Sequence, residues 1–224
     1  MKILTIILTL LSIYIPLNSK DWTFTLNAND IRMESASVNK PPLWFKKERG
    51  GFTMCNLSFF NSRGFVGTYK DTSVQGQRGY KKWPSLYLSN TNAEILKWDE
   101  KPSFNPIYIA SGYPLLLKNK EYSKLPKTYF ARRNCPRTAV GIKNDGKVII
   151  YITTSSTLAN LQRRMLELGC ISAINFDGGG STFVFVDGVM LHPNKLSRTF
   201  PNVLIWKNLP WFLKEGFIPI HLLL

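Results

Sequence analysis

The segment Asn175–Thr182, with the sequence NFDGGGST, most constrains the fold of this chain, because three consecutive glycines interrupt an apolar region. Glycine loses more backbone entropy on folding than any other residue, so a run of three requires a structural or functional reason. The segment lacks the GxxxxGK[ST] and GxGxxG spacings of nucleotide-binding loops, which open helices. Here residues 183–186 and 189–191 are β-forming runs joined by Asp187-Gly188, which predicts a hairpin after the glycines.

A strand, a helix and a second strand are predicted before the glycines. Val148–Ile152 is a β-branched run, and residues 157–168 carry leucine and methionine at helical spacing before Gly169, a natural helix stop. Ile171–Phe176 is the second apolar run. A strand, helix and strand in this order predict a β-α-β crossover that joins two parallel neighbours by a right-handed connection.

We therefore expect an α+β fold, with a mixed β-sheet core, a few packed helices and one β-α-β crossover before the DGGGS loop. Asp177 then lies just beyond the carboxyl end of a parallel strand, where sheets of this kind bind ligands. The alternative is a plain turn in which Asp177 forms a hydrogen bond with its own backbone.

The first residues predict an exported protein. Residues 1–19 combine Lys2 with a long apolar run, which is typical of a secretory signal peptide, although an uncleaved membrane anchor is the alternative. Residues 20–224 then form a single domain, with no transmembrane span in the mature chain. We expect the protein to be secreted or periplasmic.

The charge of the chain favours an anionic partner. The formal net charge is +15 at pH 7, which suits a phosphorylated glycan, an anionic lipid or a nucleic acid. The lysines and arginines are scattered, and no nucleic-acid-binding motif accompanies them, so we do not expect nucleic acid as a partner.

The cysteines and histidines predict neither a disulfide scaffold nor a metal site. Cys55, Cys135 and Cys170 are odd in number and far apart, so at most one internal disulfide is possible. Cys170 falls at a helix-to-strand junction, which favours a buried free thiol. His192 and His221 are the only histidines, and no CxxC or HExxH spacing occurs, so we expect no metal and no cofactor.

Several motifs follow one another in a specific order, of which PRTAVGI, DGGGST and RTFPN are the most informative. The motifs lie at Thr53–Phe60, Ile109–Leu116, Pro136–Ile142, Asn175–Thr182 and Arg198–Asn202. Over about residues 50–206 the chain resembles the phosphodiester glycosidase family. The resemblance implies a glycoside hydrolase that cleaves the glycosidic C–O bond of a sugar-1-phosphodiester.

The chemistry of that bond determines which residues are needed. Cleavage expels a phosphate monoester, a weakly basic leaving group, so protonation matters less than it does for ordinary glycosidases. One carboxylate and a cation for the phosphate remain necessary. The resemblance and this chemistry assign Asp177 as nucleophile or general base, and Arg137 and Arg198 as the guanidinium groups that bind phosphate. The alternative for Arg137 is a pairing with a surface acid.

The remaining polar groups of the motifs are expected to bind the substrate, a phosphorylated glycan or sugar phosphodiester. They are Asn56, Gly178, Gly179, Gly180, Ser181, Arg198 and Asn202. The alternative for Asn56 is to cap its own turn. The chain departs from the family pattern at Leu57 and Ser58, where glycines are usual. These departures allow a second function, a non-catalytic glycan-binding or envelope-associated module with a decayed site.

Overall fold

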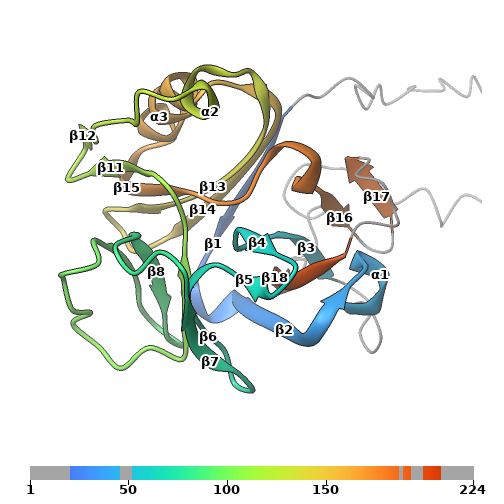
Figure 1. The fold of residues 1–224 in the computed structure, drawn as a ribbon. Coiled ribbons are helices and arrows are strands. Elements are labelled where there is room, and N and C mark those ends of the chain that lie inside the picture. The colour runs from blue at the N-terminus through green and yellow to red at the C-terminus, as the bar shows by residue number, and fades with distance from the viewer. Residues whose placement is uncertain (1–20, 46–51, 187–188, 193–198, 208–224) are drawn as a thin grey trace, which may run out of the picture.

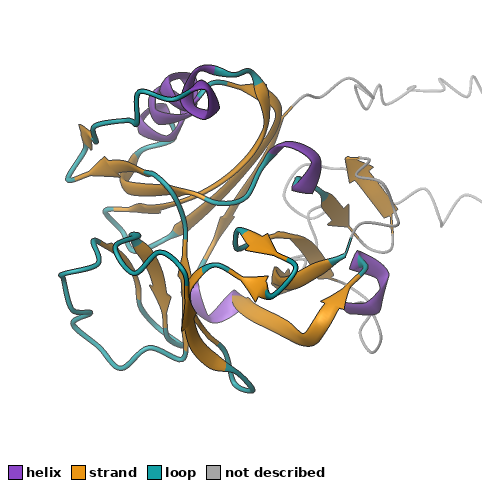
Figure 2. Ribbon diagram, viewed as in Figure 1, coloured by secondary structure: helices purple, strands orange, loops and turns teal. Residues whose placement is uncertain are grey.

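The protein is built mainly from β-strands, as Figure 2 shows. The computed structural model describes residues 21–45, 52–186, 189–192 and 199–207. The predicted signal peptide, residues 1–19, lies outside the described residues. No helix in the described ranges is both long and apolar enough to cross a bilayer.

The largest sheet, which we name sheet I, has six strands and lies beneath the helices in the upper part of Figure 1. Its strands, in spatial order, are β1 (Asp21–Leu26), β14 (Val148–Ser156), β13 (Cys135–Lys143), β15 (Cys170–Asn175), β11 (Leu115–Lys118) and β12 (Glu121–Tyr122).

Two five-stranded sheets complete the main framework. Sheet II contains β7 (Gln75–Arg78), β6 (Gly67–Lys70), β10 (Tyr108–Ser111), β8 (Ser85–Leu88) and β9 (Ala93–Leu96) in spatial order. Sheet III contains β17 (Val189–His192), β16 (Val184–Val186), β3 (Phe52–Asn56), β18 (Phe200–Lys207) and β2 (Ile31–Lys40). A short pair is formed by β4 (Phe60–Asn61) and β5 (Gly64–Phe65).

The helices of the described residues are short. They are α1 (Pro42–Phe45), α2 (Tyr129–Arg132), α3 (Leu158–Glu167) and the 3-10 turns η1 (Ala28–Asp30) and η2 (Gly179–Ser181). The longest, α3, corresponds to the helix predicted over residues 157–168 and begins where Thr157 Oγ1 accepts the N–H of Asn160 at 3.1 Å.

The predicted α+β class with a mixed sheet is wrong, because all the strand pairs of the described residues are antiparallel. Strands β14 and β15 flank α3 in the sequence, but each pairs with β13. They therefore run in the same direction without being neighbours. A strand-helix-strand pattern reports the connection between two strands, and it carries no information about a third strand lying between them.

Strand β14 is buried on both faces of sheet I over most of its length, which explains its unbroken apolar run. Val148, Ile150 and Ile152 face the core shared with sheets II and III, while Ile149 and Tyr151 face α3. A strand covered on both sides needs apolar residues at every position and loses the period-2 alternation of a half-exposed strand.

Cys55, Cys135 and Cys170 are all free thiols. Cys170 is fully buried beneath α3, as the sequence predicted, and this burial raises the pKa of its thiol to about 12. The thiol is therefore neutral at physiological pH and acts as a small apolar side chain.

Gly141 of β13 lets α3 approach sheet I closely, and we predict that Gly141→Ala destabilises the protein. A Cβ at this position would overlap Cys170 Sγ and lie 2.7 Å from Met165 Cε. Overpacking of this kind costs about 1–3 kcal/mol of the free energy of unfolding, measurable by urea denaturation. In a double-mutant cycle with Cys170→Ala the two losses should be less than additive, and strict additivity would contradict the proposed clash.

Candidate active site

Residues 176–183 carry the chain from β15 in sheet I to β16 in sheet III (Figure 1). The Phe176 N–H donates to the Thr138 carbonyl at 2.8 Å, and the Asp177 N–H donates to the Leu57 carbonyl at 3.1 Å. Asp177 therefore lies immediately beyond the carboxyl end of β15, half-buried and fixed between the two sheets. Its Oδ1 accepts the N–H of Gly178 at 2.9 Å, a bond within the loop itself.

Two of the three glycines have an identifiable structural reason. A Cβ on Gly178 would lie 2.7 Å from the Pro136 carbonyl oxygen, so only glycine lets the loop pass so close to β13. Gly179 has φ +60°, in the left-handed region, and no atom lies within 4 Å of where its Cβ would be. Gly180 is exposed. The loop therefore presents backbone without side chains next to Asp177.

The side chain of Asn56, at the end of β3, holds the loop of residues 176–183 in place through hydrogen bonds. Its Nδ2 donates to the Asp177 carbonyl at 2.6 Å, and its Oδ1 accepts from Thr138 Oγ1 at 2.8 Å and from the Phe183 N–H at 3.3 Å. The side chain is 1% exposed. Asn56 thus joins three chain segments and positions Asp177, while its predicted contact with substrate stays a prediction.

Arg137, the second residue predicted to be catalytic, lies under the loop with its guanidinium fully buried. Its Nη2 donates to the carbonyls of Phe130 at 2.6 Å and Arg133 at 3.1 Å, and its Nε donates to the Ser156 carbonyl at 3.2 Å. These carbonyls include the carboxyl-terminal end of α2, which a cation stabilises. The guanidinium also lies 4.5 Å from the centroid of the Phe130 ring.

Burial lowers the pKa of the Arg137 guanidinium, and the nearby charge of Arg133 adds to that effect. The group still carries its charge at physiological pH. The three hydrogen bonds go to carbonyl groups and not to a surface acid. A positive charge therefore stands beneath the loop, held rigidly.

The other predicted binding residues differ in their surroundings. Ser181 and Asn202 are both 1% exposed, and Asn202 Oδ1 accepts the Ser58 N–H at 3.1 Å. Arg198 lies outside the described residues. In the described part of the chain, no three His, Cys, Asp or Glu side chains are grouped so that they could hold a metal ion.

Buried polar atoms without a protein partner gather on the segments that meet at the loop. In the described ranges they include Arg137 Nη1, Asn175 Oδ1, Ser58 Oγ, Thr182 Oγ1 and Asn202 Nδ2. Buried polar atoms in proteins are normally hydrogen-bonded, so each of these unpaired atoms indicates a position where a polar ligand or water binds.

A row of aromatic side chains that no sequence motif indicated leads from Arg137 to the molecular surface. Phe59 contacts both Phe130 and Trp83, with ring centroids 6.2 Å and 5.3 Å apart. Trp83 in turn stacks on Tyr113 at 5.3 Å and on Tyr80 at 4.8 Å. These rings come from separate segments, so no local pattern could have grouped them.

Because Asn56 is the link between Asp177 and the two sheets, we predict that Asn56→Ala lowers the free energy of unfolding by about 2–4 kcal/mol. The substitution leaves several buried groups unpaired, each at a cost of about 1–3 kcal/mol. The matched control is Thr138→Val, which removes one hydrogen bond and should cost about 1 kcal/mol. Equal losses in urea denaturation would mean that Asn56 is no more important than any buried polar residue.

Comparison with known proteins agrees with the motifs. A family model described as phosphodiester glycosidase matches residues 36–207, which include Asn56, Arg137 and Asp177. The fold is similar to the zebrafish N-acetylglucosamine-1-phosphodiester alpha-N-acetylglucosaminidase catalytic domain auto-inhibited by pro-peptide, with a TM-score of 0.68 and 16% identity over 84% of this chain and 83% of that chain.

A hypothetical protein from Synechocystis has a TM-score of 0.57 and 14% identity over 84% of this chain and 59% of its own. At these identities both structures show a shared fold alone. No curated protein sequence matches. Because the family model spans most of the sequence, the chain belongs to the phosphodiester glycosidase family.

Proposed function

We propose that this protein is an exported hydrolase that cleaves the glycosidic C–O bond of a sugar-1-phosphodiester, with Asp177 as nucleophile or general base and Arg137 as the cation for the phosphate. The single observation that carries the proposal is the half-buried Asp177, fixed at the junction of two sheets and followed directly by Gly178, which packs against the side chain of the buried Arg137. Membership of the phosphodiester glycosidase family supports the bond class. The zebrafish enzyme, by its name, acts on a bond of that class.

Hydrogen bonds of the Asp177 backbone hold this residue in a fixed position, which suits attack at an anomeric carbon. The Leu57 carbonyl accepts its N–H, and Asn56 donates to its carbonyl, so the residue does not need to reorganise before reaction. Gly179, with no atom within 4 Å of where its Cβ would be, leaves room for a sugar to approach next to the carboxylate. As the glycosidic bond breaks, positive charge develops on the sugar, and a carboxylate at that position stabilises it.

Arg137 suits the leaving phosphate. Gly178 packs against it, since a Cβ on that glycine would lie 3.6 Å from Arg137 Cδ. Its Nη1 has no partner among the described residues, so one face of the guanidinium fork has donors left for phosphate. A charge held in a buried site interacts more strongly with an anion than the same charge in water does.

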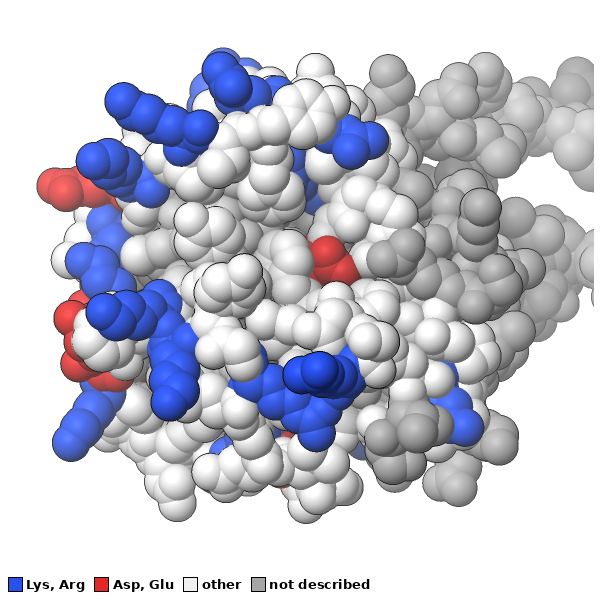
Figure 3. Space-filling view, viewed as in Figure 1, with Lys and Arg blue, Asp and Glu red and all other residues white. Residues whose placement is uncertain are grey.

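The surroundings of the site support an anionic sugar substrate. The aromatic rings of Phe59, Trp83 and Tyr113 form an apolar surface of the kind on which the C–H face of a sugar packs. Among the charged side chains on the face of the molecule shown in Figure 3, lysine and arginine predominate, and the whole chain carries +15. Export is supported by the sequence of residues 1–19.

We predict that Asp177→Asn lowers kcat on a sugar-1-phosphodiester by about 10²–10⁴-fold, with an unchanged or lower KM. The amide is nearly isosteric and its oxygen can still accept the Gly178 N–H, so the loop keeps its geometry. The amide cannot act as nucleophile or base. Steady-state kinetics on a panel of synthetic sugar-1-phosphodiesters, with circular dichroism as a control for folding, measures the effect.

Two results would contradict the proposal. A folded Asp177→Asn variant with full activity would make the carboxylate a turn residue. A wild-type protein that binds the compounds of the panel and cleaves none of them would favour the glycan-binding module.

We further predict that Arg137→Lys lowers both kcat and kcat/KM by at least about tenfold and lowers the free energy of unfolding by about 1–3 kcal/mol. An ammonium cannot reach the phosphate and the carbonyls of Phe130, Arg133 and Ser156 together. Activity is assayed at a temperature where urea denaturation shows the variant to be folded. Loss of stability with unchanged kinetics would restrict Arg137 to holding α2.

A further inference from the structure

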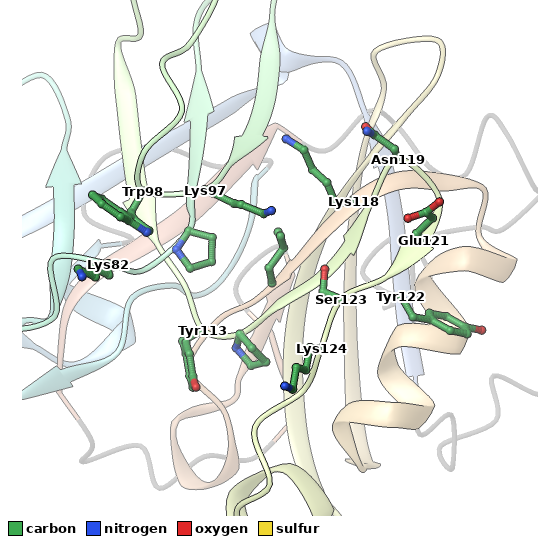
Figure 4. A pocket seen from close by; sticks show the side chains of 13 residues that line it. Lys82, Lys97, Trp98, Tyr113, Lys118, Asn119, Glu121, Tyr122, Ser123 and Lys124 are labelled. Carbon is green, nitrogen blue, oxygen red and sulfur yellow. The ribbon is translucent and has the colours of Figure 1, made fainter.

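A pocket lined by basic residues opens near the proposed site. Its volume is about 530 Å³, and it lies between the loop after β9, the β11–β12 turn and the segment before β11. Figure 4 shows the ammonium groups of Lys97 and Lys118 extending from opposite sides toward the space between them, while the Tyr122 ring points away.

The residues that line the pocket carry mainly positive charge. Four lysines line the pocket, Lys82, Lys97, Lys118 and Lys124, against one acid, Glu121. Lysine ammonium groups repel one another at close range, so a cluster around a concave surface is stabilised when an anion binds between them.

The lysines are not equally free to bind an anion. Lys118 forms an ion pair with Glu100 at 2.8 Å, and this hydrogen bond holds the pKa of Glu100 below its ordinary value. Lys82 lies over the Trp98 ring at 5.2 Å from its centroid. For Lys97 and Lys124, no ion pair of the ammonium group occurs within the described ranges of the chain.

Tyr113 connects this pocket to the proposed site. It lines the pocket, and its backbone is joined to Asn175 in both directions, with the Tyr113 N–H donating to the Asn175 carbonyl at 2.7 Å and Asn175 Nδ2 donating to the Tyr113 carbonyl at 2.6 Å. Asn175 is two residues from Asp177, a separation of at most about 7 Å along the chain. The Tyr113 wall of the pocket therefore lies within a few residues of Asp177, close enough for one substrate to contact both.

We propose that this pocket binds a second phosphate group of the substrate, so that the preferred substrate is a glycan that carries at least two phosphates. The inference rests on the proposed function. A glycan whose units are joined through phosphodiesters presents a further phosphate next to the one being cleaved. Lysine ammonium groups bind phosphate as compact charges, whereas the buried Arg137 offers a fixed fork.

The experiment compares two synthetic substrates that share one sugar-1-phosphodiester bond, of which only one carries a second phosphate on the leaving group. We expect wild type to prefer the two-phosphate substrate in kcat/KM. The variant Lys97→Gln/Lys124→Gln should lose about 3- to 10-fold on that substrate, as for two exposed charge pairs, and keep its activity on the other. The control Lys127→Gln/Lys207→Gln changes the net charge equally with two exposed lysines outside the pocket and should keep the preference.

Several outcomes would overturn the inference while leaving the proposed function intact. The first is that wild type has the same kcat/KM on both substrates. The second is that Lys97→Gln/Lys124→Gln, the pocket variant, and the control lose the same activity on the two-phosphate substrate. The third is that wild type shows the same preference when a carboxylate replaces the second phosphate. A site for free phosphate would instead make millimolar inorganic phosphate change the activity on both substrates alike, and this response would disappear in the pocket variant.

A binding measurement tests the phosphate pocket separately, in case the proposed catalytic function is wrong. If wild type cleaves neither substrate, calorimetry measures the Kd of the two-phosphate compound for wild type and for the pocket variant. A Kd that rises about 3- to 10-fold in the variant, and not in the control, supports the phosphate pocket without catalysis. An unchanged Kd overturns it.

Discussion

The carboxamide of Asn56 is the interaction on which the arrangement of the site depends. It stands at the end of β3 in sheet III, accepts the hydroxyl of Thr138 from sheet I and donates to the carbonyl of Asp177. One side chain therefore fixes the relative position of two sheets and the acidic residue at their junction. Because the carboxamide is buried, water does not compete for these hydrogen bonds, and the geometry is held more firmly than at the surface.

The buried guanidinium of Arg137, beneath the loop, also affects both the stability of the protein and the site. Removing the Arg137 guanidinium from water is costly, and three carbonyl groups with the Phe130 ring offset that cost. The Nη1 atom remains without a partner among the described residues. A cluster of buried polar atoms that the protein itself does not pair lowers stability, and such a cost is usual where a ligand supplies the missing partners.

The two kinds of cation on this molecule suit different tasks. Arg137 is fixed and buried, so salt screens it little, whereas the lysines of the basic pocket are largely exposed and their interactions weaken with ionic strength. Leu57 and Ser58, the departures from the family pattern, are both buried at the junction: the Leu57 carbonyl accepts the Asp177 N–H, and the Ser58 N–H donates to Asn202. Both contacts are made by backbone atoms, so they support the loop whichever side chains stand at positions 57 and 58.

The sequence by itself determined the features that depend on neighbouring residues. The helical spacing of residues 157–168 located α3, the Asp-Gly dipeptide located the pairing of β16 with β17, and the position of Cys170 predicted its burial. The order of the motifs indicated the family, which the family model then showed. These signals are local because a few neighbouring residues determine both the periodicity of side-chain direction and the residues that a turn accepts.

Only the tertiary structure decided how distant segments meet. It placed β13 between β14 and β15, which made sheet I antiparallel, and it joined Asn56 to Asp177 across 121 positions of the sequence. It also buried Arg137 and joined Tyr113, which lines the lysine-lined pocket, to Asn175 next to the proposed site. Which strands pair depends on the apolar surface that all three sheets bury together, set against the entropy of closing the loops between them, and no local pattern of residues contains that balance.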